Sequence, residues 1–198
     1  WVGRTCYKSE DGIQEGSAEK FVAGLIKRGH EAILEHDSIT VKFVVDRGIS
    51  HEIVRHRLAS FAQESTRYCN YNGKKFGGEI LISLPSKFYE LINKWSVDNP
   101  EILDMDLEKQ LSFLRKNDDG WKSYESALKK SEKEYLKLVG EFGWKPEDAR
   151  GVLNLDLKTE FMMCCYVETW KFFLYRRCDK HAHPHIQKIA KELKEDMK

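Results

Sequence analysis

The sequence predicts a single domain that mixes helices with strands, an α+β fold. The chain has 198 residues, which is enough for one sizeable core, and it contains no internal repeat and no low-complexity linker. Apolar and polar residues alternate over 38–46, which is typical of a half-buried strand. Over 121–140 apolar residues recur at helical spacing instead. We therefore expect one domain over residues 1–198.

The composition excludes several classes of protein. Charged residues make up 33% of the chain, yet the formal net charge is only +1, which argues against a nucleic-acid binder. We expect no membrane span and no signal peptide, because no apolar run is long enough. Five cysteines without a Cys-x-x-Cys pair indicate free thiols in a reducing, cytoplasmic setting. The chain opens at Trp1 without a methionine, so we expect its natural start to lie upstream.

Caps and periodicity predict the elements of the first half. Ser17 caps a helix that runs to about residue 28, and Gly29 fits the position just after its end. The alternating strand at 38–46 is followed by a short helix, for which Ser50 is the expected N-cap. From Arg55 onward we expect a loop, where binding groups are often found.

The elements of the second half follow from apolar runs and prolines. Proline lacks an N–H donor, so it stops a strand or opens a helix. The predicted elements are a strand at 80–84, one or two short helices within 86–118, a long helix at 121–140, a helix opened by Pro146, a strand at 157–166, a helix at about 168–177 and a last helix opened by Pro184.

Residues 55–68 carry the most informative pattern in the chain. Arg55, His56 and Arg57 are consecutive, and after seven further residues come Ser65 and then Arg67. Guanidinium groups bind phosphate oxygens in bidentate fashion, whereas hydroxyl and amide groups contact ring edges. The pattern predicts a ligand that has a phosphate and a polar ring, and a solvated basic turn is the alternative.

The histidines do not predict a metal site. His30 and His36 are six residues apart, which does not place them on one face of a helix. His181, His183 and His185 alternate in a loop, but no carboxylate or cysteine completes a coordination shell at a predictable distance. We therefore expect no bound metal at either group of histidines.

The Arg-His-Arg triplet followed after seven residues by Ser65 resembles the flavin-dependent thymidylate synthase family. The resemblance extends from about Arg4 to the final helix. Arg150 matches the arginine of the family's Pro-x-x-Ala-Arg segment, and Arg177 matches an arginine that ends a helix. The Gly-His-Glu segment that contains His30 also matches, although Ala32 stands where the family commonly has a hydroxyl.

The resemblance implies a fold, a reaction and an assembly. The fold would be α/β (α+β), with a central, mostly antiparallel sheet flanked by helices. The reaction would be the reductive methylation of deoxyuridine monophosphate (dUMP) at C5 to thymidylate (dTMP). Its cofactor would be FAD, with methylenetetrahydrofolate and NADPH as co-substrates. The protein would be a homotetramer whose active sites lie at subunit interfaces.

The resemblance also assigns site residues. It implies Arg177 and Ser65 as catalytic candidates: Arg177 beside the uracil ring to stabilise developing charge, and Ser65 as a binding group, because no base is placed to activate it as a nucleophile. Implied dUMP-binding residues are Glu52, Arg55, Gln63, Ser65, Arg67, Arg150 and Arg177. Implied FAD-binding residues are His30, Arg55, His56, Arg57, Gln63, Tyr166 and Phe172.

The chain departs from the family pattern mainly in one segment. Tyr166, Glu168 and Phe172 replace a usual Asn, Arg and polar residue, and Asn154 replaces a usual Pro. A glutamate would repel a pyrophosphate, whereas the aromatic rings could stack on a ligand. Three hypotheses follow: a flavin-dependent thymidylate synthase, a related pyrimidine-nucleotide C5 one-carbon transferase, or a nucleotide-binding homologue without flavin chemistry.

Overall fold

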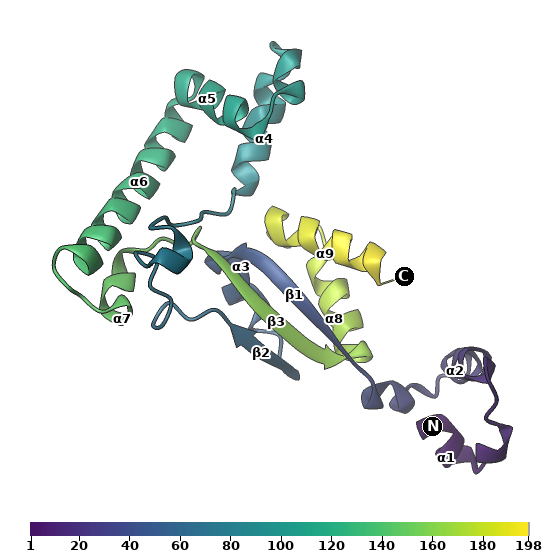
Figure 1. Ribbon diagram of the computed structural model, residues 1–198. Coiled ribbons are helices and arrows are strands. Elements are labelled where there is room, and N and C mark those ends of the chain that lie inside the picture. Colours follow the sequence, from purple (N-terminus) through teal and green to yellow (C-terminus); the bar gives the residue numbers. More distant parts are fainter. Residues whose placement is uncertain (198) are drawn as a thin grey trace.

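A three-stranded antiparallel sheet lies at the centre of the protein, whose residues 1–197 are described by a computed structural model (Figure 1). Its strands are β1 (Ser38–Asp46), β2 (Ala59–Gln63) and β3 (Lys158–Tyr166), in the order β1-β3-β2. The central strand β3 pairs with both neighbours over their whole length. This confirms the predicted antiparallel sheet and the two strands expected at 38–46 and 157–166.

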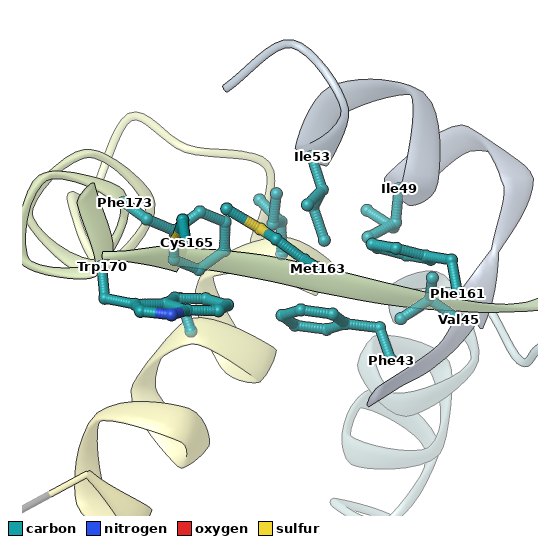
Figure 2. Packing of buried hydrophobic residues seen from close by; sticks show 11 residues of the cluster. Phe43, Val45, Ile49, Ile53, Phe161, Met163, Cys165, Trp170 and Phe173 are labelled. Atoms are coloured by element: carbon teal, nitrogen blue, oxygen red, sulfur yellow. The ribbon is translucent and has the colours of Figure 1, made fainter. Parts of the chain in front are cut away.

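Three helices cover one face of this sheet. They are α3 (Arg47–Ile53), α8 (Val167–Arg177) and α9 (Pro184–Asp196). Figure 2 shows the aromatic centre of the core between them, where Phe43 and Phe161 stack with ring centroids 5.0 Å apart. Trp170 lies against Phe43, and its indole N–H donates to the carbonyl of Ile39 at 3.1 Å. This tight core fixes α8 relative to the sheet.

Helix α3 begins earlier than the sequence predicts. Asp46, not Ser50, is its N-cap: the Asp46 carboxylate accepts a hydrogen bond from the backbone N–H of Ile49 at 2.6 Å. Ser50 lies buried inside the helix, where its hydroxyl donates to the carbonyl of Arg47. The expectation failed because aspartate and serine both cap helices well, and only the end of β1 decides between them.

Two strand predictions are also corrected. Residues 59–63, expected in a loop, form β2 because the free edge of β3 offers their backbone groups partners. Residues 80–84, expected as a strand, make only an isolated bridge between Ile82 and Leu157. Ile80 is instead buried in one cluster with Tyr135 of the long helix. The apolar residues of 80–84 therefore reflect the packing of an irregular segment and not a strand.

A separate group of helices extends from the sheet (Figure 1). It comprises α4 (Ser86–Trp95), α5 (Leu107–Asn117) and α6 (Asp119–Gly140), packed around their own apolar cluster with Trp121. The predicted short helices and the predicted long helix are therefore confirmed. The short α7 (Pro146–Ala149) follows and has Pro at its start, as expected. Among the described residues, none of the helices has both the length and the apolar character needed to cross a bilayer.

The N-terminal residues form a small unit beyond the start of β1 (Figure 1). It contains α1 (Val2–Tyr7) and α2 (Ser17–Lys27). Gly29 lies just after the end of α2 with φ 75°, which confirms its predicted position. This is the left-handed region of backbone conformation, where a residue with a Cβ atom would be strained. Ser17 is the first residue of α2 rather than its cap, which is Gly16. Within the described residues, the 3-10 helices are Glu10–Gly12, Glu31–His36, Lys74–Phe76, Pro100–Asp104 and Arg150–Val152.

Candidate active site

A cavity of about 1020 Å³ lies between the turn after α3 and the exposed side of α8. Of the predicted site residues, the structure brings together five on its wall: Arg55, His56, Arg57, Phe172 and Arg177. Eight further lining residues carried no site prediction from the sequence. They are Leu58, Glu168, Thr169, Tyr175, Arg176, Asp179, His181 and Ala182.

Arg177 is the most firmly held of the cavity's arginines. Its Nε–H donates to Nε2 of His56 at 2.8 Å, and its Nη1 donates to the Glu52 carboxylate at 3.0 Å. A third bond runs from Nη2 to the backbone carbonyl of Glu52 at 2.8 Å. The guanidinium therefore joins the end of α8 to the end of α3, and its plane is fixed before a ligand arrives.

His56 is neutral in this environment. Burial, followed by the positive charges of Arg177 and Arg176, lowers the pKa of its imidazole to about 4. Because Nε2 accepts the hydrogen bond from Arg177, the ring proton lies on Nδ1. The ring packs against Phe173 with centroids 4.9 Å apart. A neutral His56 adds no competing positive charge beside Arg177.

Leu58 gives the turn before β2 an unusual backbone. It has φ 62°, in the left-handed region that non-glycine residues rarely adopt, and its side chain is largely exposed on the cavity wall. Such conformations persist where the surrounding structure imposes them, and they cluster at ligand sites.

One face of α8 forms a wall of the cavity. Glu168, Phe172, Tyr175 and Arg176 are spaced by four, three and one residues, which places them on one side of the helix. Glu168 therefore faces the cavity, a direction the sequence left open. Arg176 and Tyr175 were missed as site residues, although their helical spacing from Phe172 is a signal that could have found them.

A second group of predicted site residues lies at the other end of β2. The backbone N–H of Arg67 donates to the Ser65 hydroxyl at 3.3 Å, and Arg150 donates to the Thr66 hydroxyl at 3.4 Å. The structure thus brings Arg150 to the 65–67 segment across more than eighty residues of sequence. The five residues of β2, about 16 Å long, separate this group from the cavity.

Glu52 does not line the cavity but holds Arg177, and three further predicted residues lie outside both groups. Gln63 donates from its amide to the hydroxyls of Ser50 and Thr159 within the fold. Tyr166 is about half exposed at the N-cap position of α8. His30 lies in the N-terminal unit, hydrogen-bonded to and stacked on Tyr7.

The alternating histidines have separate partners. Nδ1 of His181 lies 2.8 Å from the Asp179 carboxylate, and Nδ1 of His183 accepts from the N–H of His185 at 3.3 Å as the cap of α9. His185 contacts the Asp46 carboxylate at 3.0 Å. Within residues 1–197, no three histidine, cysteine or acidic side chains come together as a metal site would require.

The fold and the cavity define a class: an α+β protein with a cavity whose cationic and aromatic lining suits a phosphorylated ligand with flat rings. Four arginines supply donors for phosphate, and Phe172 and Tyr175 offer faces for stacking. The chain belongs to the family of thymidylate synthase complementing proteins, whose model matches residues 1–198.

Curated relatives of this chain are flavin-dependent thymidylate synthases. The one from Corynebacterium efficiens is 28% identical over 100% of this chain and 73% of its own length. The one from Thermococcus kodakarensis is 29% identical over 93% of this chain and 64% of its own.

A crystal structure of flavin-dependent thymidylate synthase ThyX from Helicobacter pylori, complexed with FAD and dUMP, shares the fold. Its TM-score is 0.63 at 20% identity, covering 96% of this chain and 83% of that one.

Proposed function

We propose that this protein is a flavin-dependent thymidylate synthase. It methylates dUMP at C5 to give dTMP, with methylenetetrahydrofolate as carbon donor and NADPH as reductant. The observation that carries the proposal is Arg177, pre-oriented on the cavity wall by Glu52 and His56. The family match over residues 1–198 supports the same reaction.

The cavity residues fit FAD as the cofactor. Arg55, Arg57 and Arg176 supply donors for a pyrophosphate, and Phe172 and Tyr175 supply aromatic faces for flat rings. FAD, when bound, supplies the reducing equivalents that complete the methyl group. The protein supplies position and charge, so no cysteine thiol has to attack the substrate ring.

Arg177 is the proposed catalytic residue. Activation of the uracil ring at C5 places negative charge on its carbonyl oxygens, and an already oriented guanidinium stabilises that charge without reorganisation. Glu52 fixes the guanidinium, and the neutral imidazole of His56 accepts its Nε–H. We propose Arg55, together with Glu52, as a further contact to the nucleotide.

The remaining nucleotide contacts are proposed to come from a neighbouring subunit. Ser65, Arg67 and Arg150 would hold the phosphate and the sugar, but β2 separates them from Arg177 in one chain. A homotetramer with shared sites would join the two groups. His30, Gln63 and Tyr166 lie outside the cavity of the single chain and would meet ligand only at such a site. The protein would act in the cytoplasm, where its five free cysteines stay reduced.

Glu168 favours one alternative function. Its carboxylate faces the cavity where a pyrophosphate would be repelled, which fits a nucleotide-binding homologue that has lost flavin chemistry. The two functions differ in whether the protein takes up and reduces FAD.

Visible absorbance, followed by a dTMP assay, tests the proposal. The purified protein, after addition of FAD, should show flavin bands that bleach with NADPH under anaerobic conditions, and it should form dTMP. Arg177→Lys should lower the rate of dTMP formation on the order of 10²-fold, because lysine cannot reproduce the guanidinium's fixed donors. Arg115→Lys, at an ion pair in α5, is the matched control and should leave the rate unchanged.

A protein that stays colourless with FAD yet binds dUMP would support the nucleotide-binding homologue instead. Unchanged dTMP formation by Arg177→Lys would remove Arg177 from the mechanism.

A further inference from the structure

The wall that α8 contributes to the cavity changes in character along the helix. Glu168 lies near its N-terminal end, Phe172 and Tyr175 follow, and Arg176 lies near its C-terminal end. A rise of 1.5 Å per residue puts Glu168 and Arg176 about 12 Å apart along the axis. The wall thus presents a carboxylate, then aromatic rings, then a cation.

The Glu168 carboxylate has acceptor capacity to spare. Its Oε1 accepts from the Lys171 ammonium at 2.6 Å, whereas Oε2 accepts no hydrogen bond from any residue within 1–197. An ion pair three residues apart in the first turn of a helix is common on protein surfaces. Here, however, Glu168 lines the cavity and Lys171 does not. One carboxylate oxygen therefore remains for a ligand in the cavity.

The order of the carboxylate, the aromatic rings and the cation along α8 sets the direction in which a nucleotide would bind. A phosphate is repelled by Glu168 and attracted by Arg176, Arg55 and Arg57, so the ligand's direction along α8 is set. The base lies farther from the phosphate than the ribose does. Its ring would therefore lie against Phe172 and Tyr175, and its far edge would meet Glu168.

We propose that Glu168 accepts a hydrogen bond from the exocyclic amine of an adenine ring in this cavity. This rests on the proposed function, because FAD contains an adenine ring. It deepens that function by identifying the side chain that recognises the base. A carboxylate is an acceptor only, so it favours an amine donor and rejects a carbonyl oxygen at the same position.

Adenosine and inosine diphosphates test this directly, since inosine carries a carbonyl oxygen where adenine carries its amine. Calorimetric titration of the purified full chain should show ADP binding at least about tenfold more tightly than IDP, because hydrogen bonds to charged groups discriminate by at least that factor. Glu168→Gln should bring the two affinities within about threefold, since an amide can present either a donor or an acceptor. Lys171→Gln is the matched control, which should keep the preference for ADP.

Equal binding of ADP and IDP by the unmodified protein would overturn the proposal, as would a preference that survives in Glu168→Gln. Lack of binding of either nucleotide would also overturn it. If 2′-deoxy-ADP binds more weakly and Glu168→Gln abolishes that difference, the carboxylate contacts the sugar instead and the proposal is wrong.

The same measurements separate this proposal from the proposed function. A yellow protein that forms dTMP without preferring ADP would retain the function and lose the role of Glu168. A colourless protein that prefers ADP through Glu168 would lose the function and keep an adenine-nucleotide site.

Discussion

His56 is a basic side chain that the fold keeps neutral. It is only 8% exposed, and burial together with Arg177 and Arg176 lowers the pKa of its imidazole to about 4. A histidine in the unfolded chain has a pKa near its usual value of 6.5. As the pH falls from about 6.5 to about 4, the unfolded chain binds a proton that the folded protein does not.

The free energy of unfolding should therefore decrease over that pH window, by up to about 3 kcal/mol from this one residue, and be fully retained above it. Urea unfolding at several pH values between 7.5 and 4.5 measures this. His56→Asn, which can still accept from Arg177 but does not titrate, should lose stability less steeply with falling pH. Parallel pH curves for the two proteins would show that His56 is not the source.

At the scale of elements, Asp46 joins three of them. It ends β1, caps α3 through the N–H of Ile49 and contacts His185 of α9. Burial alone would raise the pKa of its carboxyl, but the hydrogen bonds from His185 and Ile49 outweigh burial and lower it. This carboxylate contributes stability above its usual pKa, and that contribution is lost as the pH falls through its lowered value.

Substitutions at Asp46 should separate the cap from the ion pair. Asp46→Asn keeps an acceptor for the N–H of Ile49, whereas Asp46→Ala removes it. The free energy of unfolding of the alanine variant should therefore be about 1 kcal/mol lower than that of the asparagine variant. Denaturant midpoints at pH 7 compare the two. Asp106, an exposed N-cap on α5, is the matched control. There the difference in stability between the asparagine and alanine variants should come only from the lost cap hydrogen bond. Equal midpoints for the two Asp46 variants would mean that the cap contributes nothing.

At the scale of the whole molecule, helices within residues 1–197 cover only one side of the central sheet. The helices α3, α8 and α9 pack on the face that holds Phe43 and Phe161, while Val44 and Met162 on the opposite face are exposed. The predicted nucleotide-binding residues other than Gln63 also fall into two groups at opposite ends of β2. Both observations support an assembly in which a neighbouring chain completes the site.

Mixing two defective variants tests that assembly. Arg177→Lys impairs the cavity group and Arg150→Ala impairs the other, so each protein alone should be nearly inactive. If sites are shared between chains, co-refolded mixtures should recover up to about a quarter of the normal dTMP-forming activity, because random pairing gives that fraction of intact sites. Mixtures of each variant with itself are the control. No recovery, despite mixed oligomers, would place both arginines in one chain's site.

The sequence was sufficient for elements whose signals are local. Three elements were predicted from patterns within their own residues, and all three are present. The patterns are the alternation at 38–46, the apolar run at 157–166 and the helical spacing at 121–140. The Arg55–Arg57 triplet with Arg177 was likewise predicted as one site, through a family resemblance, and these residues share the cavity.

Tertiary structure alone decided the rest. The strand character of 59–63 depends on pairing with β3, and the irregular path of 80–84 depends on packing against α6. Neither conformation is encoded within the segment itself. The direction of Glu168 into the cavity and the neutrality of His56 depend on how α8 lies against α3. The chain by itself determined which chemical groups are available. Their neighbours, separations and charge states were set only when distant segments packed together, because burial and electrostatic interactions depend on distance in space and not in sequence.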